Sequence, residues 1–410
     1  MMIPLSEAQN HVLERVSNLR AMAVPLDECL DLCTSAAIVA EEAIPPFDNT
    51  AVDGFAIRTS DLEADPAGTV RLRVAGTVAA GDPPSEIAAP KTALRIMTGA
   101  VIPRRADAVV MVEDVIVEGD YITFSSPVSP GDNIRRQGSD ITPGSLLFPE
   151  RTVLRAAHLG VLASVGYAKV PVYRRARVGV ISTGSELVDT GRPLNPGEIR
   201  DSNRHSLMAI LSGAGVEVID LGVIADDPEA LRKAFVSSAA DLDAIVTSGG
   251  VSVGDFDYTK AVLSEVSGGQ MRWMQIAIRP AKPFAFGTIG TTPVFGLPGN
   301  PVSAMVSFEL FVRPAIKKMH GYLDLHAPSL AATATNGYRR HRDGKTHFVR
   351  SLLEVDESGS LQVTSLDKQG SHMLHEMSRS NALAITPDGD GFDAGDRVMV
   401  MQLDPLTSRH

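Results

Sequence analysis

Cysteine is scarce in this sequence, whose 410 residues contain only Cys29 and Cys33. A disulfide framework of the kind that holds small secreted domains together is therefore excluded, and no further Cys or His residues stand at the spacing of a zinc site. Leucines recur at helical intervals around the two cysteines. We therefore expect both thiols to be packed in the interior and reduced.

Apolar runs are also short. No stretch approaches the roughly 18 apolar residues that cross a bilayer, and the first residues, MMIPLSEAQNHVLERV, lack the basic and apolar regions of a signal peptide. We expect neither secretion nor membrane insertion, and therefore a cytoplasmic location.

Positive charge is in the minority, with 38 Lys and Arg against 49 Asp and Glu and a net charge of −11. Such a field repels nucleic acid and anionic membranes, so we expect neither as a partner, and any anionic ligand needs a local basic site. Hydrophobic residues make up 44% of the chain and charged residues 21%, which is typical of a globular protein. The length predicts two to four domains.

The first 174 residues predict two domains, one inserted in the other. Ser6 and Gln9 have the spacing of a capping box before an amphipathic helix. Residues 45–141 consist of short β-branched runs broken by turn sequences, which predicts a β-rich insertion domain. Residues 142–174 are again rich in alanine and leucine, and we expect them to pack on the N-terminal helix. Residues 1–44 and 142–174 would then form one discontinuous helical and linker domain.

The second half of the chain predicts an α/β domain followed by a β domain. Over residues 175–327 strand and helix patterns alternate, which indicates a doubly wound parallel sheet. Asp227 and Pro228 have the character of an N-cap and first residue of one helix, and residues 213–215 close the helix before it. Residues 328–410 contain short alternating runs and predict a C-terminal β-barrel or sandwich.

Four glycine-rich or acidic clusters follow predicted strands of the α/β domain: STGSEL (182–187), GVIADDP (222–228), TSGGVSVGDFDYTK (247–260) and GLPGNPVS (296–303). Because the carboxyl ends of parallel strands meet at one edge of a sheet, the clusters should line one crevice. Backbone amides of the glycine and serine run suit a phosphate. The predicted ligand-binding residues are Ser248, Gly249, Gly250, Ser252, Gly254, Pro298, Gly299, Asn300 and Pro301.

Carboxylates gather in the same clusters, namely Glu186, Asp201, Asp226, Asp227, Asp255 and Asp257. Helix capping accounts for some of them, Asp227 above all. The remainder indicates a Mg²⁺ site, because Mg²⁺ binds through carboxylates together with substrate phosphates. We predict Glu186, Asp201, Asp226 and Asp257 as its ligands.

Three other motifs in the sequence are weaker. The spacing from Gly249 to Gly254 resembles a P-loop, but Asp255 stands where that motif requires lysine, which excludes a Walker-type ATPase. Residues 250–254 also have the form of a nucleophile elbow, and histidines follow later in the chain, so a serine hydrolase acting through Ser252 stays open as an alternative. The DGDG sequence at 388–391 begins like a calcium loop but lacks the later ligands, and we interpret it as a turn.

Basic residues complement the acidic clusters in three segments. These contain Arg279 and Lys282, Arg135 and Arg136, and the run YRRHRDGKTHFVR at 338–350. Most of that run has the character of a solvated hairpin. Arg350 follows Phe348 in an alternating strand, and we expect its side chain to point inward.

Taken in order, the strings PPFDNTAVDGFAIR (45–58), RIMTGAVIP (95–103), DAVVMVED (107–114), GDNIRRQGSDI (131–141), STGSEL, SGGVSVGDFDYTK and GLPGNPVSAMVSFE (296–309) resemble the molybdopterin molybdenumtransferases, which include the E domain of gephyrin. The resemblance covers nearly the whole chain. It implies an elongated homodimer of four-domain subunits, in which the α/β domain of one subunit faces the β domains of the other, so that the active site is shared.

The family implies an activity and its residues. Its members insert molybdate into adenylylated molybdopterin in a Mg²⁺-dependent step that releases AMP and completes molybdenum cofactor synthesis. Molybdopterin adenylyltransferase and cofactor-accepting enzymes are the implied partners. By motif, Asp53, Glu186, Asp226 and Asp257 resemble the catalytic acids, and Thr98, Arg135 and Asp140 the substrate-binding groups of the insertion domain. Arg279, Lys282, Pro283, Ser303, Arg350 and Ser371 resemble the molybdate site.

The sequence departs from the family pattern in WMQIAIRPAKPF, where Gln275 replaces a frequent lysine and Ala281 replaces a usual glycine. The lost cation at 275 would weaken the grip on pyrophosphate. A scaffold or binding paralogue of the same fold, with reduced turnover, is therefore the second functional hypothesis.

Overall fold

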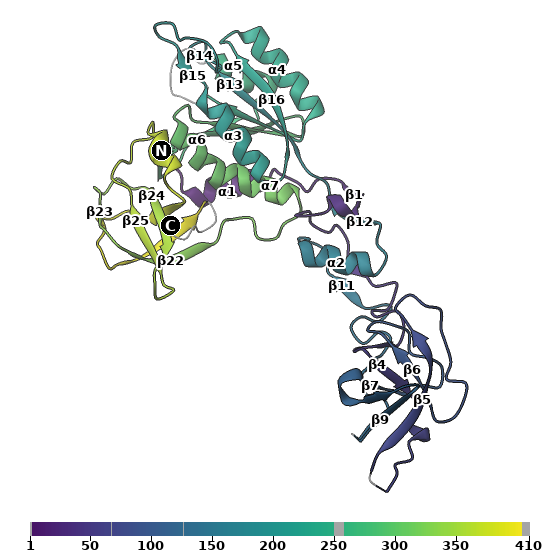
Figure 1. The fold of residues 1–410 in the computed structure, drawn as a ribbon. Helices are drawn as coiled ribbons and strands as arrows, with labels where there is room; N and C mark the ends of the chain where they lie inside the picture. Colours follow the sequence, from purple (N-terminus) through teal and green to yellow (C-terminus); the bar gives the residue numbers. More distant parts are fainter. Residues whose placement is uncertain (1, 67, 126, 250–257, 404–410) are drawn as a thin grey trace.

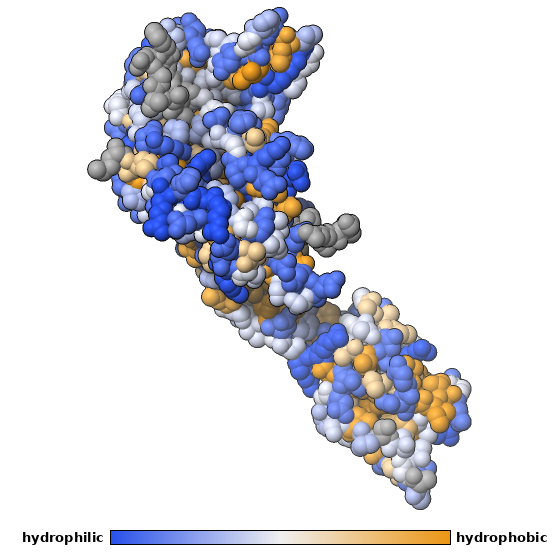
Figure 2. All heavy atoms as spheres, turned by 90° about the vertical axis from the view of Figure 1, so that its left-hand side faces the viewer, coloured by the Kyte–Doolittle hydropathy of each residue, from blue (hydrophilic) through white to orange (hydrophobic). Residues whose placement is uncertain are grey.

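The structure is a computed structural model that describes residues 2–66, 68–125, 127–249 and 258–403. The chain is elongated (Figure 1), with the α/β and C-terminal domains at one end and the insertion domain at the other, joined by the linker domain. In the space-filling view of Figure 2 the insertion domain is a separate lobe. None of the helices in the described ranges has the length and apolar character needed to span a membrane.

The α/β domain contains a six-stranded sheet in the order β16-β13-β17-β21-β20-β18. Four strands are parallel, as predicted: β13 (Arg177–Thr183), β16 (Glu217–Ile224), β17 (Ala244–Ser248) and β21 (Thr292–Leu297). The prediction of a parallel sheet is wrong for β20 (Pro283–Ile289), which runs antiparallel to both of its neighbours, β21 and β18 (Arg272–Gln275). The physical reason is that two residues separate β20 from β21, and such a short connection makes a hairpin rather than a crossover.

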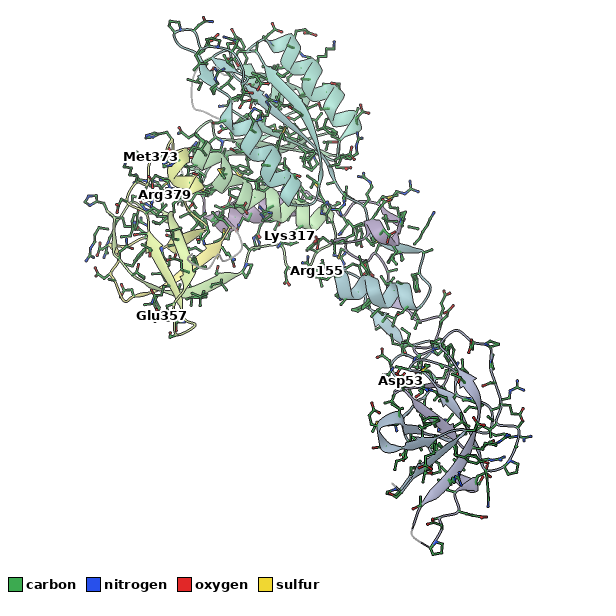
Figure 3. All side chains as sticks on the ribbon, viewed as in Figure 1. Asp53, Arg155, Lys317, Glu357, Met373 and Arg379 are labelled. Atoms are coloured by element: carbon green, nitrogen blue, oxygen red, sulfur yellow. The ribbon has the colours of Figure 1, made fainter. Side chains whose placement is uncertain are left out.

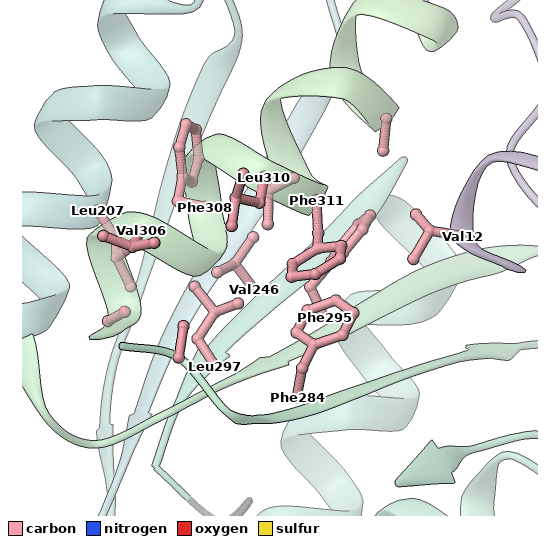
Figure 4. Packing of buried hydrophobic residues seen from close by; sticks show 14 of the residues in the cluster. Val12, Leu207, Val246, Phe284, Phe295, Leu297, Val306, Phe308, Leu310 and Phe311 are labelled. Carbon is pink, nitrogen blue, oxygen red and sulfur yellow. The ribbon is translucent and has the colours of Figure 1, made fainter. Parts of the chain in front are cut away.

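Helices cover both faces of this sheet, which gives the doubly wound arrangement. On one face lie α3 (Ser202–Gly213) and α6 (Pro301–Ser307), and on the other α4 (Pro228–Asp241) and α5 (Tyr258–Val266). Asp227 caps α4 through the amide of Ala230 (2.7 Å) and Pro228 begins the helix, as predicted. Aromatic rings fill the core under α6 (Figure 4), where Phe284 and Phe311 stack with centroids 4.2 Å apart.

The N-terminal helix α1 (Leu5–Leu13) belongs to the same core. The predicted capping box is wrong: Pro4 precedes the helix without a side-chain cap, and the Gln9 amide donates instead to the Leu310 carbonyl (3.1 Å). Ala8 and Val12 are buried against the π-helical turn η4 (Phe308–Val312) and α7 (Arg313–Met319). Tertiary packing thus fixes this helix where a local cap was expected.

The linker domain joins two distant stretches of the chain. β1 (Ala21–Pro25) pairs with β12 (Lys169–Tyr173), β2 (Ile38–Val39) with β11 (Leu146–Phe148), and α2 (Ala156–Ser164) packs on η1 (Leu26–Glu28). Residues 142–174 therefore pack on residues 21–39, and the prediction that they pack on the N-terminal helix is wrong. Cys29 and Cys33 are free and buried here, as expected, and burial raises the pKa of each thiol to about 11.

The two remaining domains are built from mostly antiparallel sheets. The insertion domain orders its strands β7-β4-β6-β5-β9-β8, namely β7 (Ala108–Met111), β4 (Gly54–Ile57), β6 (Thr92–Ile96), β5 (Val70–Val78), β9 (Tyr121–Phe124) and β8 (Ile116–Glu118). The C-terminal domain closes into a five-stranded barrel of β22 (Ser329–Ala334), β24 (Thr346–Val355), β25 (Leu361–Ser365), β26 (Ala382–Thr386) and β28 (Arg397–Gln402). One parallel pair lies in the insertion domain (β5 with β6) and one in the C-terminal barrel (β22 with β25). The DGDG sequence connects β26 to β27 (Gly391–Phe392) and is a turn, as predicted.

Candidate functional site

The candidate site begins at the carboxyl ends of β13, β17 and β21. Gly249 follows β17, and its amide donates to the Leu297 carbonyl at the end of β21 (3.2 Å). Its φ is +95°, and a Cβ added to it would lie 2.7 Å from the Thr183 carbonyl oxygen at the end of β13. Only glycine therefore fits at this crossing of three strand ends. The strand ends that the sequence predicts to line one crevice therefore meet here.

Asn203, which was not among the predicted site residues, connects the strand-end loops. Its side-chain amide donates to the Ser248 hydroxyl (2.7 Å) and to the Gly299 carbonyl (2.8 Å). It thus connects the start of α3 with the loops that follow β17 and β21. The signal in the sequence was its place two residues after Asp201, in the first turn of a helix that opens on the crevice.

Two of the predicted acids, Glu186 and Asp226, are exposed at the strand ends. Their loops are joined by two hydrogen bonds: the Ser185 amide donates to the Asp226 carboxylate (3.3 Å), and the Asp226 amide donates to the Ser185 hydroxyl (3.2 Å). The Glu186 carboxylate lies over Gly184, where an added Cβ would be 2.7 Å from Oε2. The structure therefore brings the two carboxylate-bearing loops to the same edge.

Asp201 differs from the prediction, because its carboxylate is a buried helix cap. The side chain is 1% exposed. One oxygen accepts hydrogen bonds from the Arg204 amide (3.1 Å) and the Ser182 hydroxyl (3.0 Å), and the other accepts one from Arg204 Nε (3.0 Å). With both oxygens engaged by protein donors, Asp201 is withdrawn as a metal ligand.

The predicted Mg²⁺ site includes a residue whose structure is not described. Within the described ranges no group of three or more His, Cys, Asp or Glu side chains is arranged to hold a metal ion. Asp257, the fourth predicted ligand, lies outside the described residues, as do Gly250, Ser252, Gly254 and Asp255. The predicted phosphate-binding backbone and the serine hydrolase alternative both involve Ser252, so both stay predictions for the same reason.

Next to the crevice is a pocket of about 480 Å³, which we call the oxyanion pocket. Five of the six residues predicted for the molybdate site line this pocket, and they come from three segments of the chain. Two residues of the 298–301 loop line it as well. These are Arg279, Lys282, Pro283, Ser303 and Ser371, with Pro298 and Asn300. Three further lining residues, Lys345, Gln369 and His372, were not among the predicted site residues.

Arg350, the sixth predicted residue, lies behind the wall of this pocket. It is 1% exposed, so the prediction that it points inward is confirmed. Its guanidinium donates to the carbonyls of Gly370 (2.9 Å) and Lys368 (2.6 Å). The Gln369 side chain forms two hydrogen bonds with the Arg350 backbone: it accepts one from the amide (3.0 Å) and donates one to the carbonyl (3.1 Å). Arg350 and Gln369 therefore hold the loop that carries Ser371.

The basic run at 338–350 is more ordered than a solvated hairpin. Arg340 has a side chain that is 1% exposed and donates to the Asp343 carboxylate (2.6 Å), and Lys345 binds the same carboxylate (2.9 Å). Burial alone would raise the pKa of Asp343, but hydrogen bonds from Lys345 and His347 outweigh it and bring the pKa to about 2. Asp343 thus stays ionised and positions Lys345 at the pocket.

The insertion domain brings two of its predicted residues together. The Asp53 carboxylate accepts hydrogen bonds from the Thr98 amide (2.7 Å) and hydroxyl (2.8 Å), which lower its pKa. Arg135 lies on β10 (Ile134–Arg135), opposite Asn49 of β3 (Asn49–Thr50), and Asp140 is exposed near Ile44. Figure 3 shows Asp53 in the insertion domain, which the linker domain separates from the α/β domain. Within one chain these residues are separate from the crevice.

The two departures in the 272–283 segment have different consequences. Ala281 is buried between Arg279 and Lys282 with a φ of +69°, in the left-handed region where glycine is favoured. Gln275 ends β18, and its carbonyl accepts a hydrogen bond from the Ile3 amide (2.8 Å). The replacement at 281 therefore introduces backbone strain beside the pocket, whereas Gln275 has a structural role through its backbone.

Three family models match the chain in order. They are described as MoeA N-terminal region (domain I and II), over residues 3–166, probable molybdopterin binding domain, over 179–318, and MoeA C-terminal region (domain IV), over 333–403.

Full-length relatives carry the same description. A molybdopterin molybdenumtransferase of Haemophilus influenzae is 40% identical over 97% of this chain and 98% of its own, and molybdopterin molybdenumtransferase 2 of Mycobacterium tuberculosis is 36% identical over 94% and 95%. A crystal structure of the molybdopterin biosynthesis moeA protein from Pyrococcus horikosii, 32% identical, superposes with a TM-score of 0.83 over 99% of this chain and all of that one.

Proposed function

Because the chain belongs to the molybdopterin molybdenumtransferase family and is a transferase that completes molybdenum cofactor biosynthesis, we propose that the crevice and the oxyanion pocket are the two parts of its active site. The family implies molybdate and adenylylated molybdopterin as substrates. The observation that carries the proposal is the convergence of residues from separate segments on one basic pocket beside a strand-end crevice.

Molybdate occupies the oxyanion pocket in this proposal. A tetrahedral dianion is matched by the Arg279 guanidinium and the Lys282 ammonium, with Lys345 as a third cation. Ser303 and Ser371 supply hydroxyl donors that can align with its oxygens. Arg350 adds positive charge from behind the wall and holds the loop in place.

The phosphates of adenylylated molybdopterin occupy the crevice. The proposed contacts are the backbone around Ser248 and Gly249 and the loop from Pro298 to Pro301, together with Gly250, Ser252 and Gly254. The exposed carboxylates of Glu186 and Asp226 fit Mg²⁺, which takes carboxylate oxygens and substrate phosphates, and Asp257 would be the third ligand. A bound Mg²⁺ would neutralise negative charge on the pyrophosphate. The chain's own residues orient the pyrophosphate between the crevice and the pocket.

The insertion domain completes the site of a second subunit. Asp53, Thr98, Arg135 and Asp140 are the groups it would contribute, and their distance from the crevice of their own chain supports a homodimer with shared sites. Molybdopterin adenylyltransferase is the proposed supplier of the substrate, and molybdoenzymes are the acceptors of the product. The two free, buried cysteines agree with the proposed cytoplasmic location.

The decisive experiment measures molybdate-dependent release of AMP from adenylylated molybdopterin by the purified protein. Asp53→Ala and Glu186→Ala should each give a folded protein with no release. Absence of release by the unmodified protein would favour the scaffold hypothesis. Unchanged release by both variants would refute the assignment of these acids.

Mixed dimers then test the sharing of the site. The two variants are coexpressed with different tags, so that a heterodimer contains one site with both defects and one with neither. Random pairing predicts recovery of about a quarter of the unmodified activity. If Asp53 served its own chain's crevice, each site would contain one defect and no activity would return.

A further inference from the structure

We propose that the chain has a second anion site, specific for a small oxyanion of the phosphate class, in a cleft between the linker domain and the α/β domain. We call it the junction cleft. It has a volume of about 260 Å³ and is lined by Asp31, Arg155, Arg175, residues 213–215, Arg313, Ile316, Lys317, His320 and Tyr322.

The junction cleft is distinct from the active site. Helix α3 begins at the crevice, where Asn203 lies, and ends at the cleft with Gly213. Its 12 residues span about 18 Å, so the two sites lie at opposite ends of this helix. Figure 3 labels Arg155 and Lys317 on the two sides of the junction.

Four cations converge on this small space in a protein whose net charge is −11. Two of them have carboxylate partners: Arg155 pairs with Asp31, and Arg313 pairs with Glu309 (2.7 Å). The other two, Arg175 and Lys317, form no ion pair with any residue in the described ranges. Arg175 donates to the carbonyls of Leu30 (2.9 Å) and Gly215 (3.1 Å), and Lys317 donates to that of Asp324 (3.2 Å).

Helix capping explains only part of this arrangement. Arg175 interacts with the last turn of α3 through Gly215, as a cation at a helix C-terminus does. Lys317, however, is half-buried beside the Tyr322 ring, with its ammonium 6.0 Å from the ring centroid. Burial lowers its pKa and Arg313 lowers it further, and the smaller opposing effects of the Asp324 and Glu309 carboxylates do not offset them. A cation in such a place is stabilised by an anion that shares the cleft.

The size of the cleft selects the ligand. Pockets for drug-sized molecules begin at roughly 300 Å³, so this cleft suits phosphate or pyrophosphate rather than a nucleotide. A guanidinium fork from Arg175 and an ammonium from Lys317 match two edges of such an oxyanion. Arg155 approaches from the linker domain, so a bound anion would also connect the two domains.

The test measures the reactivity of Lys317 in the full-length protein. Lysines are acetylated with an amine-selective reagent, and the rate at each site is followed by peptide mass spectrometry in pyrophosphate, inorganic phosphate or sulfate, and in sodium chloride of equal ionic strength. We expect pyrophosphate and phosphate to slow modification of Lys317 by about 10-fold at saturation, the effect of one charge-assisted contact. Lys318, which donates to the Leu13 carbonyl (2.5 Å) away from the cleft, is the internal reference.

Variants connect the protection to the cleft. Arg175→Gln and Arg155→Gln should each weaken pyrophosphate protection by about 10-fold, since each removes a cation from the site. Arg342→Gln is the matched control, because Arg342 pairs with Asp390 on the surface of the C-terminal domain. Equal Lys317 rates with and without pyrophosphate would overturn the proposal. Equal protection of Lys317 by chloride would also overturn it. So would slow labelling of Lys317 in all buffers that becomes faster on dilution, because a second copy of the chain would then cover the cleft.

Discussion

Removing the carboxylate of Asp201 should destabilise the α/β domain. The structure makes this residue the cap of α3 and a partner of the buried Arg204, whereas its sequence context also fits a metal ligand. Asp201→Ala deletes the cap on the Arg204 amide, the acceptor of the Ser182 hydroxyl and one of three carboxylates that bind the Arg204 guanidinium. Each loss acts on groups that stay buried.

The magnitude follows from these contacts. Loss of an N-cap costs about 1 kcal/mol, and loss of a hydrogen bond to a charged acceptor costs about 1.5 kcal/mol. Breaking a buried ion pair costs about 3–5 kcal/mol when a charge is left alone, but Arg204 keeps Asp189 (2.8 Å) and Asp220. The expected loss in free energy of unfolding is therefore about 2–4 kcal/mol. Asp201→Asn, which keeps a capping oxygen, should lose about 1 kcal/mol.

Urea unfolding followed by tryptophan fluorescence measures this loss, because Trp273 is the only tryptophan and lies on β18 of the α/β sheet. Asp227→Ala is the matched control: it removes an exposed cap with a single amide contact at α4 and should cost about 1 kcal/mol. If Asp201→Ala unfolds at the same urea concentration as the unmodified protein while AMP release needs more Mg²⁺, the carboxylate serves the metal and the structural reasoning fails.

Three further predictions use the same protein. Burial lowers the pKa of His320 to about 4, and its Nε2 accepts the Ala176 amide (2.9 Å). Between pH 6.5 and 4 the unfolded chain thus binds more protons, so stability should fall by up to about 3 kcal/mol as the pH drops through this window. His320→Gln, compared by urea unfolding at pH 7 and 5, should flatten the dependence, and an unaltered slope would contradict the burial argument. Ala281 has a left-handed backbone conformation. Ala281→Gly should change the free energy of unfolding by less than about 1 kcal/mol, whereas Ala281→Val should lower it by more than about 2 kcal/mol. Equal melting temperatures of the Gly and Val variants would refute the backbone strain. Gln369→Ala should raise the KM for molybdate by about 10-fold with kcat retained, because the two hydrogen bonds that hold the pocket loop to the Arg350 backbone are lost. Lys368→Ala, at an exposed position of the same loop, should leave both constants unchanged. An equal fall in the kcat of Gln369→Ala would contradict a role limited to positioning the loop.

Local signals in the sequence predicted the elements that local chemistry controls. Asp227 and Pro228 begin α4 because an Asp side chain and a proline ring satisfy a helix start without outside help. The parallel pairing of β13, β16, β17 and β21 followed from the alternation of strand and helix. Asp201 has the same capping chemistry, but its burial with Arg204 and Ser182 depends on residues brought together by the fold, so the metal interpretation could not be rejected from the sequence.

Contacts between distant segments could not be predicted from the sequence. Asn203 reaches Gly299 across 96 positions, and its place in the first turn of α3 does not indicate which distant residue it contacts. Arg340 lies in a run with the composition of a solvated hairpin, yet it donates to two carbonyls and one carboxylate of the 386–388 segment. In both cases a polar side chain is placed by partners that only the folded chain supplies.

The two halves of the proposed site differ in how they are held. The oxyanion pocket lies on a seam between domains that share one core: β19 (Ile278–Arg279) pairs with β24 of the barrel, and Phe348 and Leu383 of the barrel pack with the α/β core. Folding of a single chain therefore fixes Arg279 relative to Ser303. Asp53 instead sits on a lobe connected to that core only through the linker domain (Figure 1). In the shared-site proposal, folding builds the molybdate half, and only assembly of two chains adds the acid of the other half. Activity should therefore be lost on dilution below the dimer dissociation constant, while molybdate binding persists.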